Sequence, residues 1–432
     1  MKVVARQLGC LLLFLLGWYG LFYLATLIMI PEPARLDTNM NWRKTVYNDE
    51  AHELVLGGYM LRRSCDPKMF LLGASNVREG FRPDELQPLF PSLDIHNLAI
   101  GGDNVTQVRQ VLGIMKANVP DKVLTNSVVV LGIWYGLFVD NRKLWGQEGI
   151  TNLQRQQIGS FFYRREGNEM VPVLQSSQMC LAVQVLRPYF FCLNLQKRCR
   201  YYYPRLREFI SDYLLRRTID FSVFSDKPTV VDESFKTRAI EFWFDYIGRR
   251  DGTLDNEQFD ELVRLCNVIT ETGAQLILVD LPLPRWHQER SPYWTDYQER
   301  KMSSLRAILK SPRVRYVNLQ HMSNDEMFSD SGHPDPHFTC MWSKALRQDL
   351  EKGHPIPEWL FKTGEGFLST PFRKFGHEFM VFLRGSGCEA KRIGSHSLFG
   401  DPGRIGAYSQ WAQTEGDLFP GQPQRPHPKS VA

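Results

Sequence analysis

The sequence has little charge of one sign, no closely spaced cysteine pair and no apparent internal repeat. Its 432 residues carry a formal net charge of +5 at pH 7. That charge is well short of the dense single-sign field that nucleic-acid binding usually needs. None of the eight cysteines belongs to a CxxC pair, which argues against zinc-ribbon and thioredoxin-type sites.

Long hydrophobic runs are also scarce. Apolar residues make up 43% of the chain and charged residues 23%. These values fit a mainly folded, soluble body and exclude a fully disordered chain, a collagen-like chain and a polytopic transporter. A chain of this length buries a substantial core without metal or disulfide staples.

One apolar run is long enough to cross a bilayer. It extends from Leu8 to Ile30 without a charged residue, and about 20 helical residues span a hydrocarbon core of about 30 Å. Lys2 and Arg6 precede it, and a basic flank favours a cytoplasmic N-terminus. We therefore predict a membrane anchor over residues 1–35 and an extracytoplasmic body. The alternative, a cleaved signal peptide, exports the body as well.

Between about residues 69 and 350, short apolar runs alternate with amphipathic stretches, which is typical of a parallel sheet covered by helices. Thr106–Ala117 and Asn256–Thr272 have apolar residues at helical spacing. The order of elements predicts a doubly wound α/β sheet with helices on both faces and any site at the carboxyl ends of the strands. The predicted strands are Met69–Leu72, Ile95–Ile100, Ser127–Ile133, Gln275–Asp280 and Val314–Leu319.

The alternation stops from about residue 141 to 250, in an aromatic and basic segment that we interpret as a mostly helical insertion. It is either a solvated helix face with snorkelling arginines or a surface that binds anionic lipid or polysaccharide in a salt-sensitive way. Two interpretations are open for Cys192 and Cys199, a disulfide across a short loop or buried free thiols. Residues 385–432, rich in Gly and Pro, predict a flexible tail after a body over 36–384.

The first predicted strand leads into a small-residue turn that carries a hydroxyl, Ser75. A serine is a weak nucleophile at neutral pH and needs a histidine within hydrogen-bond reach, which a carboxylate orients. Asp330 and His333 stand three residues apart on one loop near the other end of the body. They can face each other while the histidine points at a serine on another strand.

These residues resemble two sequence blocks of the SGNH/GDSL hydrolase superfamily. Gly73-Ala-Ser75 is similar to the first block, a glycine, a variable residue and the nucleophilic serine. Asp330-Ser-Gly-His333 is similar to the DxxH of the last block. The resemblance covers roughly residues 69–350 outside the insertion and implies a three-layer, flavodoxin-like fold.

The two middle blocks differ in how well they match. Residues 97–103 resemble the second block, in which Gly102 takes the position of the oxyanion-hole glycine. The third block normally reads GxND, whereas Trp134 stands here where the asparagine is expected. In place of that asparagine, either Asn104 or the indole N–H of Trp134 would donate a hydrogen bond to the oxyanion. The difference matters because loss of one such donor costs about 10²–10³ in turnover.

The chain combines a single anchor, an exported SGNH-like body and a degenerate third block. In this combination it is similar to bacterial DltD-like and alginate-acetylation proteins, which work beside a membrane-bound O-acyltransferase. The resemblance implies that Ser75 carries an acyl group, with His333 as base and then acid and Asp330 orienting its ring. Backbone N–H groups of Ser75 and Gly102 would hold the oxyanion. We expect a serine esterase or O-acyltransferase, without a cofactor, that acts on acyl esters of a cell-envelope polysaccharide.

Three alternatives stand beside this expectation. The first is a catalytically silent SGNH-like module that binds glycan or supports a membrane acyltransferase. The second gives the base role to His337, although only His333 has an aspartate at the family's spacing. The third is a metal site formed by Asp330, His333, Asp335 and His337. The two prolines in this loop forbid the helix that would hold histidines four apart on zinc, so we expect no metal.

Overall fold

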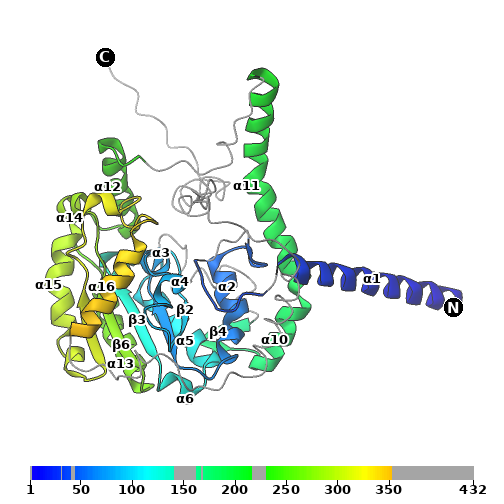
Figure 1. Ribbon diagram of the computed structural model, residues 1–432, viewed down its shortest axis with the longest axis horizontal. Helices are drawn as coiled ribbons and strands as arrows, with labels where there is room; N and C mark the ends of the chain where they lie inside the picture. The colour runs from blue at the N-terminus through cyan, green and yellow to red at the C-terminus, as the bar shows by residue number, and fades with distance from the viewer. Residues whose placement is uncertain are drawn as a thin grey trace, which may run out of the picture. The chain divides into compact units, whose positions relative to one another are not determined.

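The structure is a computed structural model that describes residues 2–30, 32–39, 44–140, 162–166, 169–216 and 230–352. The chain divides into two compact units. The first comprises residues 1–200 and 230–389, and the second comprises residues 201–229 and 390–432. The first unit holds the sheet and all residues of the predicted site (Figure 1).

A five-stranded parallel sheet forms the centre of the first unit. Its order, β2-β1-β3-β6-β7, corresponds to the 2-1-3-4-5 order of flavodoxin-like sheets. Strands β1 and β3 are buried along their whole length, which explains their nearly continuous apolar runs. The predicted α/β fold with a central parallel sheet is confirmed. The strands are β1 Lys68–Leu72, β2 Asp94–Asn97, β3 Val128–Ile133, β6 Gln275–Asp280 and β7 Val314–Asn318.

Helices cover both faces of this sheet (Figure 1). Helix α13 contacts both α5 and α15, and α16 packs against α3 and α4. The predicted helices agree with α5 and α13 to within one residue at each end. The helices of the sheet unit outside the insertion are α2 Glu50–Gly57, α3 Ser75–Gly80, α4 Pro83–Leu86, α5 Val105–Asn118, α6 Asp121–Leu124, α13 Asn256–Glu271, α14 Arg285–Arg290, α15 Tyr293–Leu305 and α16 Thr339–Lys352.

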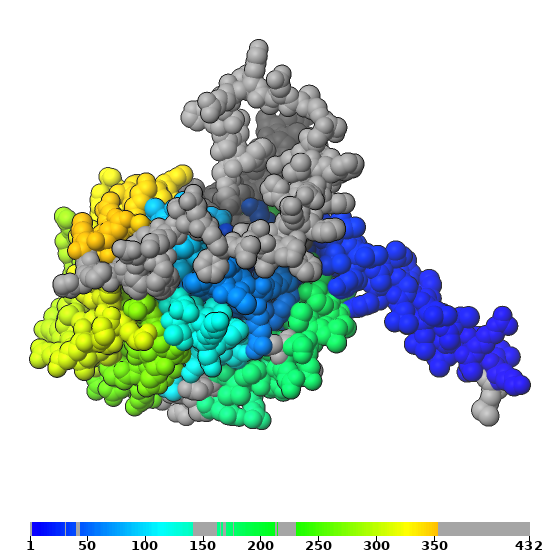
Figure 2. All heavy atoms as spheres, turned by 60° about the horizontal axis from the view of Figure 1, so that its bottom comes forward, coloured from blue at the N-terminus to red at the C-terminus, as the bar shows by residue number. Residues whose placement is uncertain are grey.

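The N-terminal segment forms one long helix, α1 Lys2–Met29, that is apolar and long enough to cross a membrane. Figure 2 shows it projecting from the body. The chain then enters the sheet unit almost at once. Asp37 bridges Asn97 at the end of β2, and the Leu36 backbone N–H donates to His96 Nδ1 at 3.1 Å.

The insertion contains more than helices. It forms α10 Ser176–Val185, α11 Arg187–Arg216 and α12 Glu233–Ile247, together with an antiparallel hairpin of β4 Tyr163–Glu166 and β5 Glu169–Pro172. The sequence did not indicate this hairpin, because each strand has only four residues. Tertiary contacts hold it: Tyr163 is buried, and Asn118 Nδ2 on α5 donates to its hydroxyl at 2.7 Å. Residues 141–161 and 217–229 lie outside the described residues.

Cys192 and Cys199 are both free and exposed on α11. Seven residues along a helix separate two Cα atoms by about 10 Å, beyond the reach of a disulfide. The disulfide interpretation is therefore wrong, and so is the interpretation of these two as buried thiols. The predicted tail, residues 385–432, lies outside the described residues.

Candidate active site

A tight turn places Ser75 at the carboxyl end of β1. Gly73 has a φ of +143°, and a Cβ there would lie 2.5 Å from Val77 Cγ2 and 3.0 Å from the Gly132 carbonyl oxygen. Only glycine avoids both the steric contact and the strain at this φ. The turn ends at Ser75, which is the first residue of α3 and is partly exposed.

Asp330 and His333 form a buried hydrogen-bonded pair on the loop that precedes α16. His333 Nδ1–H donates to Asp330 Oδ2 at 2.7 Å. The other carboxylate oxygen, Oδ1, accepts from the backbone N–H groups of Gly332 and His333, each at 2.8 Å. These bonds fix the carboxylate and engage Nδ1, so Nε2 is the ring atom that would exchange a proton with a serine, as in a serine-activating histidine.

Each member of this pair stabilises the charged form of the other. Burial by itself raises the pKa of Asp330, but the charge and hydrogen bonds of His333 outweigh burial and hold that pKa below its usual value. Burial likewise disfavours the imidazolium, yet the charges of Asp330 and Glu79 raise the pKa of His333 to about 9. The pair is therefore ionised at neutral pH.

A hydrogen bond ties the serine turn to this loop. Asn76, the neighbour of Ser75, is fully buried, and its Nδ2 donates to the carbonyl oxygen of Gly332, the neighbour of His333. Two segments more than 250 residues apart in sequence are thus joined at this edge of the sheet. Within the described part of the chain no hydrogen bond joins Ser75 to His333 directly. Such bonds are often long without substrate and shorten in the reacting complex.

The two residues predicted after the second strand have different surroundings. Gly102 adopts a φ of +74°, and its carbonyl oxygen accepts from the Tyr246 hydroxyl at 3.0 Å. Asn104 is the N-cap of α5, where its Oδ1 accepts from the Gln107 N–H at 3.0 Å. Its Nδ2 donates to the Val139 carbonyl oxygen at 3.1 Å. Asn104 therefore has a structural role.

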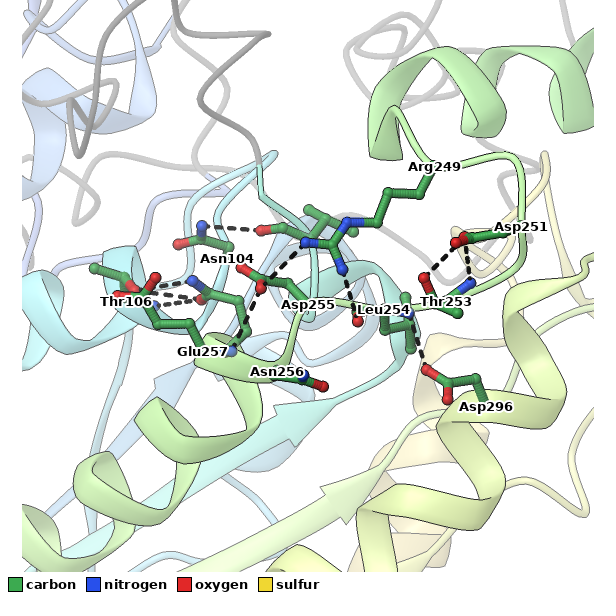
Figure 3. A network of polar contacts seen from close by, with 12 residues as sticks. Asn104, Thr106, Arg249, Asp251, Thr253, Leu254, Asp255, Asn256, Glu257 and Asp296 are labelled. Carbon is green, nitrogen blue, oxygen red and sulfur yellow. Dashed lines mark hydrogen bonds and ion pairs between the residues drawn. The ribbon is translucent and has the colours of Figure 1, made fainter.

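Figure 3 shows Asn104 within a wider network of polar contacts. The Thr106 N–H on α5 donates to Gln258 Oε1 on α13 at 3.1 Å. Arg249 contacts Asp255, the N-cap residue of α13, at 3.4 Å. The first of these contacts joins α5 to α13, and the second joins the segment after α12 to the start of α13.

Trp134 directly follows β3 and faces the loop of the Asp330–His333 pair. A Cβ placed on Gly332 would lie 3.9 Å from the edge of the indole, at Cη2. The ring packs edge-on against Trp243, with centroids 5.1 Å apart, and is almost completely buried. Its Nε1–H has no hydrogen-bond partner among the described residues. Buried donors are normally satisfied, so this N–H is the better of the two predicted replacements for the missing asparagine.

The sequence analysis missed His287 on α14. This residue is fully buried and burial lowers its pKa to about 4, so it is neutral at pH 7. Its Nδ1–H donates to the Ser331 carbonyl oxygen, and its Nε2 accepts from the Tyr135 hydroxyl. Trp243 Nε1–H donates to the Ser331 hydroxyl at 3.4 Å. The only sequence signal was position, since His287 follows the carboxyl end of β6.

His337 is exposed and stands apart from the Asp330–His333 pair. Its backbone N–H donates to Asp335 Oδ1 at 2.9 Å within the loop. Among the described residues no group of three His, Cys, Asp or Glu side chains is placed to hold a metal ion. No family model matches the sequence, and no curated protein matches it significantly.

Proposed function

We propose that this chain is a membrane-anchored, extracytoplasmic SGNH-like serine esterase or O-acyltransferase that acts on acyl esters of a cell-envelope glycan. One observation carries the proposal: the hydrogen-bonded Asp330–His333 pair is tied through Asn76 and Gly332 to the turn that presents Ser75. These groups lie at the carboxyl end of the sheet, next to the point where the strand order reverses between β1 and β3. Ligands bind at such a point in open α/β sheets.

The reaction proceeds in two halves. Ser75 Oγ attacks the acyl carbonyl carbon while neutral His333 takes its proton at Nε2. Asp330 orients and stabilises the resulting imidazolium. The histidine then protonates the departing alcohol oxygen, which leaves an acyl group on Ser75. A water molecule or a sugar hydroxyl next attacks this ester, again with His333 as base, and the proton returns to Ser75.

The developing oxyanion needs donors of its own. Backbone N–H groups of Ser75 and Gly102 are two candidates, and the buried indole N–H of Trp134 is a third. Hydrolysis and transfer share the same acyl-enzyme intermediate. They differ only in whether water or a sugar hydroxyl attacks its ester. A membrane-bound O-acyltransferase is the expected donor of acyl groups if transfer is the activity.

Active-site labelling tests this proposal on the full chain in detergent. A fluorophosphonate and a chromogenic acyl ester are offered to wild type and to Ser75→Ala, His333→Ala and His337→Ala. We expect Ser75→Ala to abolish labelling, His333→Ala to slow it severely, and the matched control His337→Ala to behave as wild type. Labelling that survives in Ser75→Ala would refute the assignment.

Two observations favour a second candidate, the catalytically silent module that binds glycan or supports a membrane acyltransferase. Ser75 and His333 are not hydrogen-bonded to each other, and the usual asparagine is replaced by Trp134. For this candidate we expect no fluorophosphonate labelling of folded wild-type protein. Glycan binding would also be the same in wild type and Ser75→Ala.

A further inference from the structure

An exposed apolar stripe runs along α10 and the first turns of α11. Its members follow one another at intervals of three or four residues, so they share one side of the two helices. Leu181 is 66% exposed and Tyr189 is 51% exposed. The apolar stripe consists of Leu181, Val185, Tyr189, Cys192, Leu195 and Cys199.

The opposite side of these helices packs against the body and is partly polar. Arg187 and Asn194 are buried, and Asn194 Nδ2 donates to the carbonyl oxygens of Thr45 and Tyr47, each at 2.6 Å. Lys197 Nζ donates to the Asn48 carbonyl oxygen at 2.6 Å. A surface helix of a soluble protein normally buries its apolar side and exposes its polar side. In this pair of helices the buried side also holds apolar side chains, among them Met179, Val183 and Phe190, so the exposed apolar stripe is additional to that packing.

The end of α1 meets the body at the start of α11, midway along the apolar stripe (Figure 1). Arg187 Nη2 donates to the carbonyl oxygens of Thr26, at 3.4 Å, and Ile30, at the end of α1. The Phe22 and Phe191 rings pack edge to face with centroids 5.6 Å apart. The end of the candidate membrane span is therefore in direct contact with the helices that carry the stripe.

We propose that the apolar stripe lies in the interfacial layer of the bilayer that α1 crosses, so that α10 and the start of α11 form a second, in-plane membrane contact. This inference rests on the membrane anchoring in the proposed function. An exposed apolar surface of this kind marks a contact with a membrane or a partner, and its continuity with α1 selects the membrane. Lys197 is turned toward the body, whereas Arg200 is exposed beside Cys199 at the far end of the stripe. Because the six members of the stripe carry no charge, we expect apolar burial to contribute most of the contact, with a weak salt dependence.

Spin labels on native cysteines test the contact in the full chain. Each variant keeps one cysteine, which carries the spin label, and has its other accessible cysteines replaced by serine. The variants are reconstituted into phosphatidylcholine vesicles that contain no other protein. Labels at Cys192 and Cys199 are expected to collide several-fold more often with dissolved oxygen, relative to an aqueous nickel chelate, than a label at Cys65. Cys65 is the matched control because it is exposed on the body. A label at Cys10, within α1, reports whether the span itself is in lipid.

Two results would overturn the inference. If Cys10 is in lipid while Cys192 and Cys199 are as accessible to the chelate as Cys65, the stripe faces water or awaits a protein partner. If the Cys10 label is also in water, α1 does not cross the membrane, and the proposed membrane contact of the apolar stripe is ruled out as well. Fluorophosphonate labelling is scored separately, so failure of the enzymatic proposal is distinguished from both results.

A charge substitution provides a second measurement. Tyr189→Glu is expected to raise the chelate accessibility of the Cys192 label, because a carboxylate resists transfer into the interface. The matched control is Met302→Glu, at an exposed residue on α15 outside the stripe. The lipid contact is expected to persist at high salt and without anionic lipid. Loss of contact in high salt would instead indicate binding to anionic headgroups and contradict the apolar mechanism.

Discussion

A histidine that takes a proton from serine must be neutral when the substrate arrives. His333 does not meet this condition at pH 7, because Asp330 and Glu79 keep its pKa near 9 despite burial. Arg78, which bonds to Glu79 at 2.6 Å, partly opposes them. A substrate that displaces water or shields Glu79 would therefore also activate the base.

This charge state predicts an alkaline activity profile. The neutral fraction of His333 increases with pH, so kcat/KM on a chromogenic ester should rise through about pH 9. Glu79→Gln removes one negative charge and should move this rise to lower pH. The measurement is a pH–rate profile of both proteins. A wild-type rise centred near 6.5, the ordinary histidine value, would show that the two carboxylates do not control the base.

The two predicted replacements for the missing asparagine can be separated by mutation. Trp134→Phe keeps an aromatic ring but removes the N–H, and should lower kcat by roughly 10²–10³ with little change in KM. Asn104→Ala removes the cap of α5 and should instead lower the free energy of unfolding by about 1 kcal/mol. Steady-state kinetics and urea unfolding of both variants make the comparison. Equal losses of kcat would count against Trp134 as the oxyanion donor.

At the scale of elements, the strands were the most predictable part of the chain. The apolar runs of β3 and β6 are buried from end to end, so composition alone located them. The predicted second strand extended to Ile100, but β2 ends at Asn97. There Asn97 Nδ2 turns to the carbonyl oxygens of Arg78 and Phe81, at 3.0 and 3.1 Å. A side chain that bonds to another segment is not visible in local periodicity.

The same distinction applies to the site. Asp330 and His333 were predictable as a pair because three residues in one loop bring the side chains together. The bond from Asn76 to Gly332 joins distant segments and leaves no local pattern. His287 was missed for the same reason, since its role depends on partners contributed by other loops.

The burial of neutral His287 leads us to expect that acid lowers the stability of the fold. Its pKa is about 4 when folded and about 6.5 when exposed, so the unfolded chain binds more protons between these values. The free energy of unfolding should therefore fall by roughly 3 kcal/mol as pH drops from 6.5 to 4. Denaturant unfolding over this range, compared with His287→Phe, makes the test. The variant should be less stable at pH 7 and have a flatter profile, and an equally steep profile would contradict the assignment.

At the scale of the whole molecule, the site draws on segments along most of the sheet unit. Ser75 follows β1, Trp134 follows β3, and the Asp330–His333 loop follows β7. Parallel strands bring their carboxyl ends to one edge, which is why such distant residues meet. The sequence predicted that edge, whereas the packing of α12 and α14 on the loop required the structure.

The connection between α1 and the sheet is short. Only five residues lie between Ile30 and Leu36, a span of six residue steps, and Leu36 is already bonded to β2. Even fully extended, six residues reach about 20 Å. If α1 crosses the membrane as proposed, the body is held within a thin layer beside the lipid. The proposed acyl chemistry would then be confined to glycan segments close to the membrane surface.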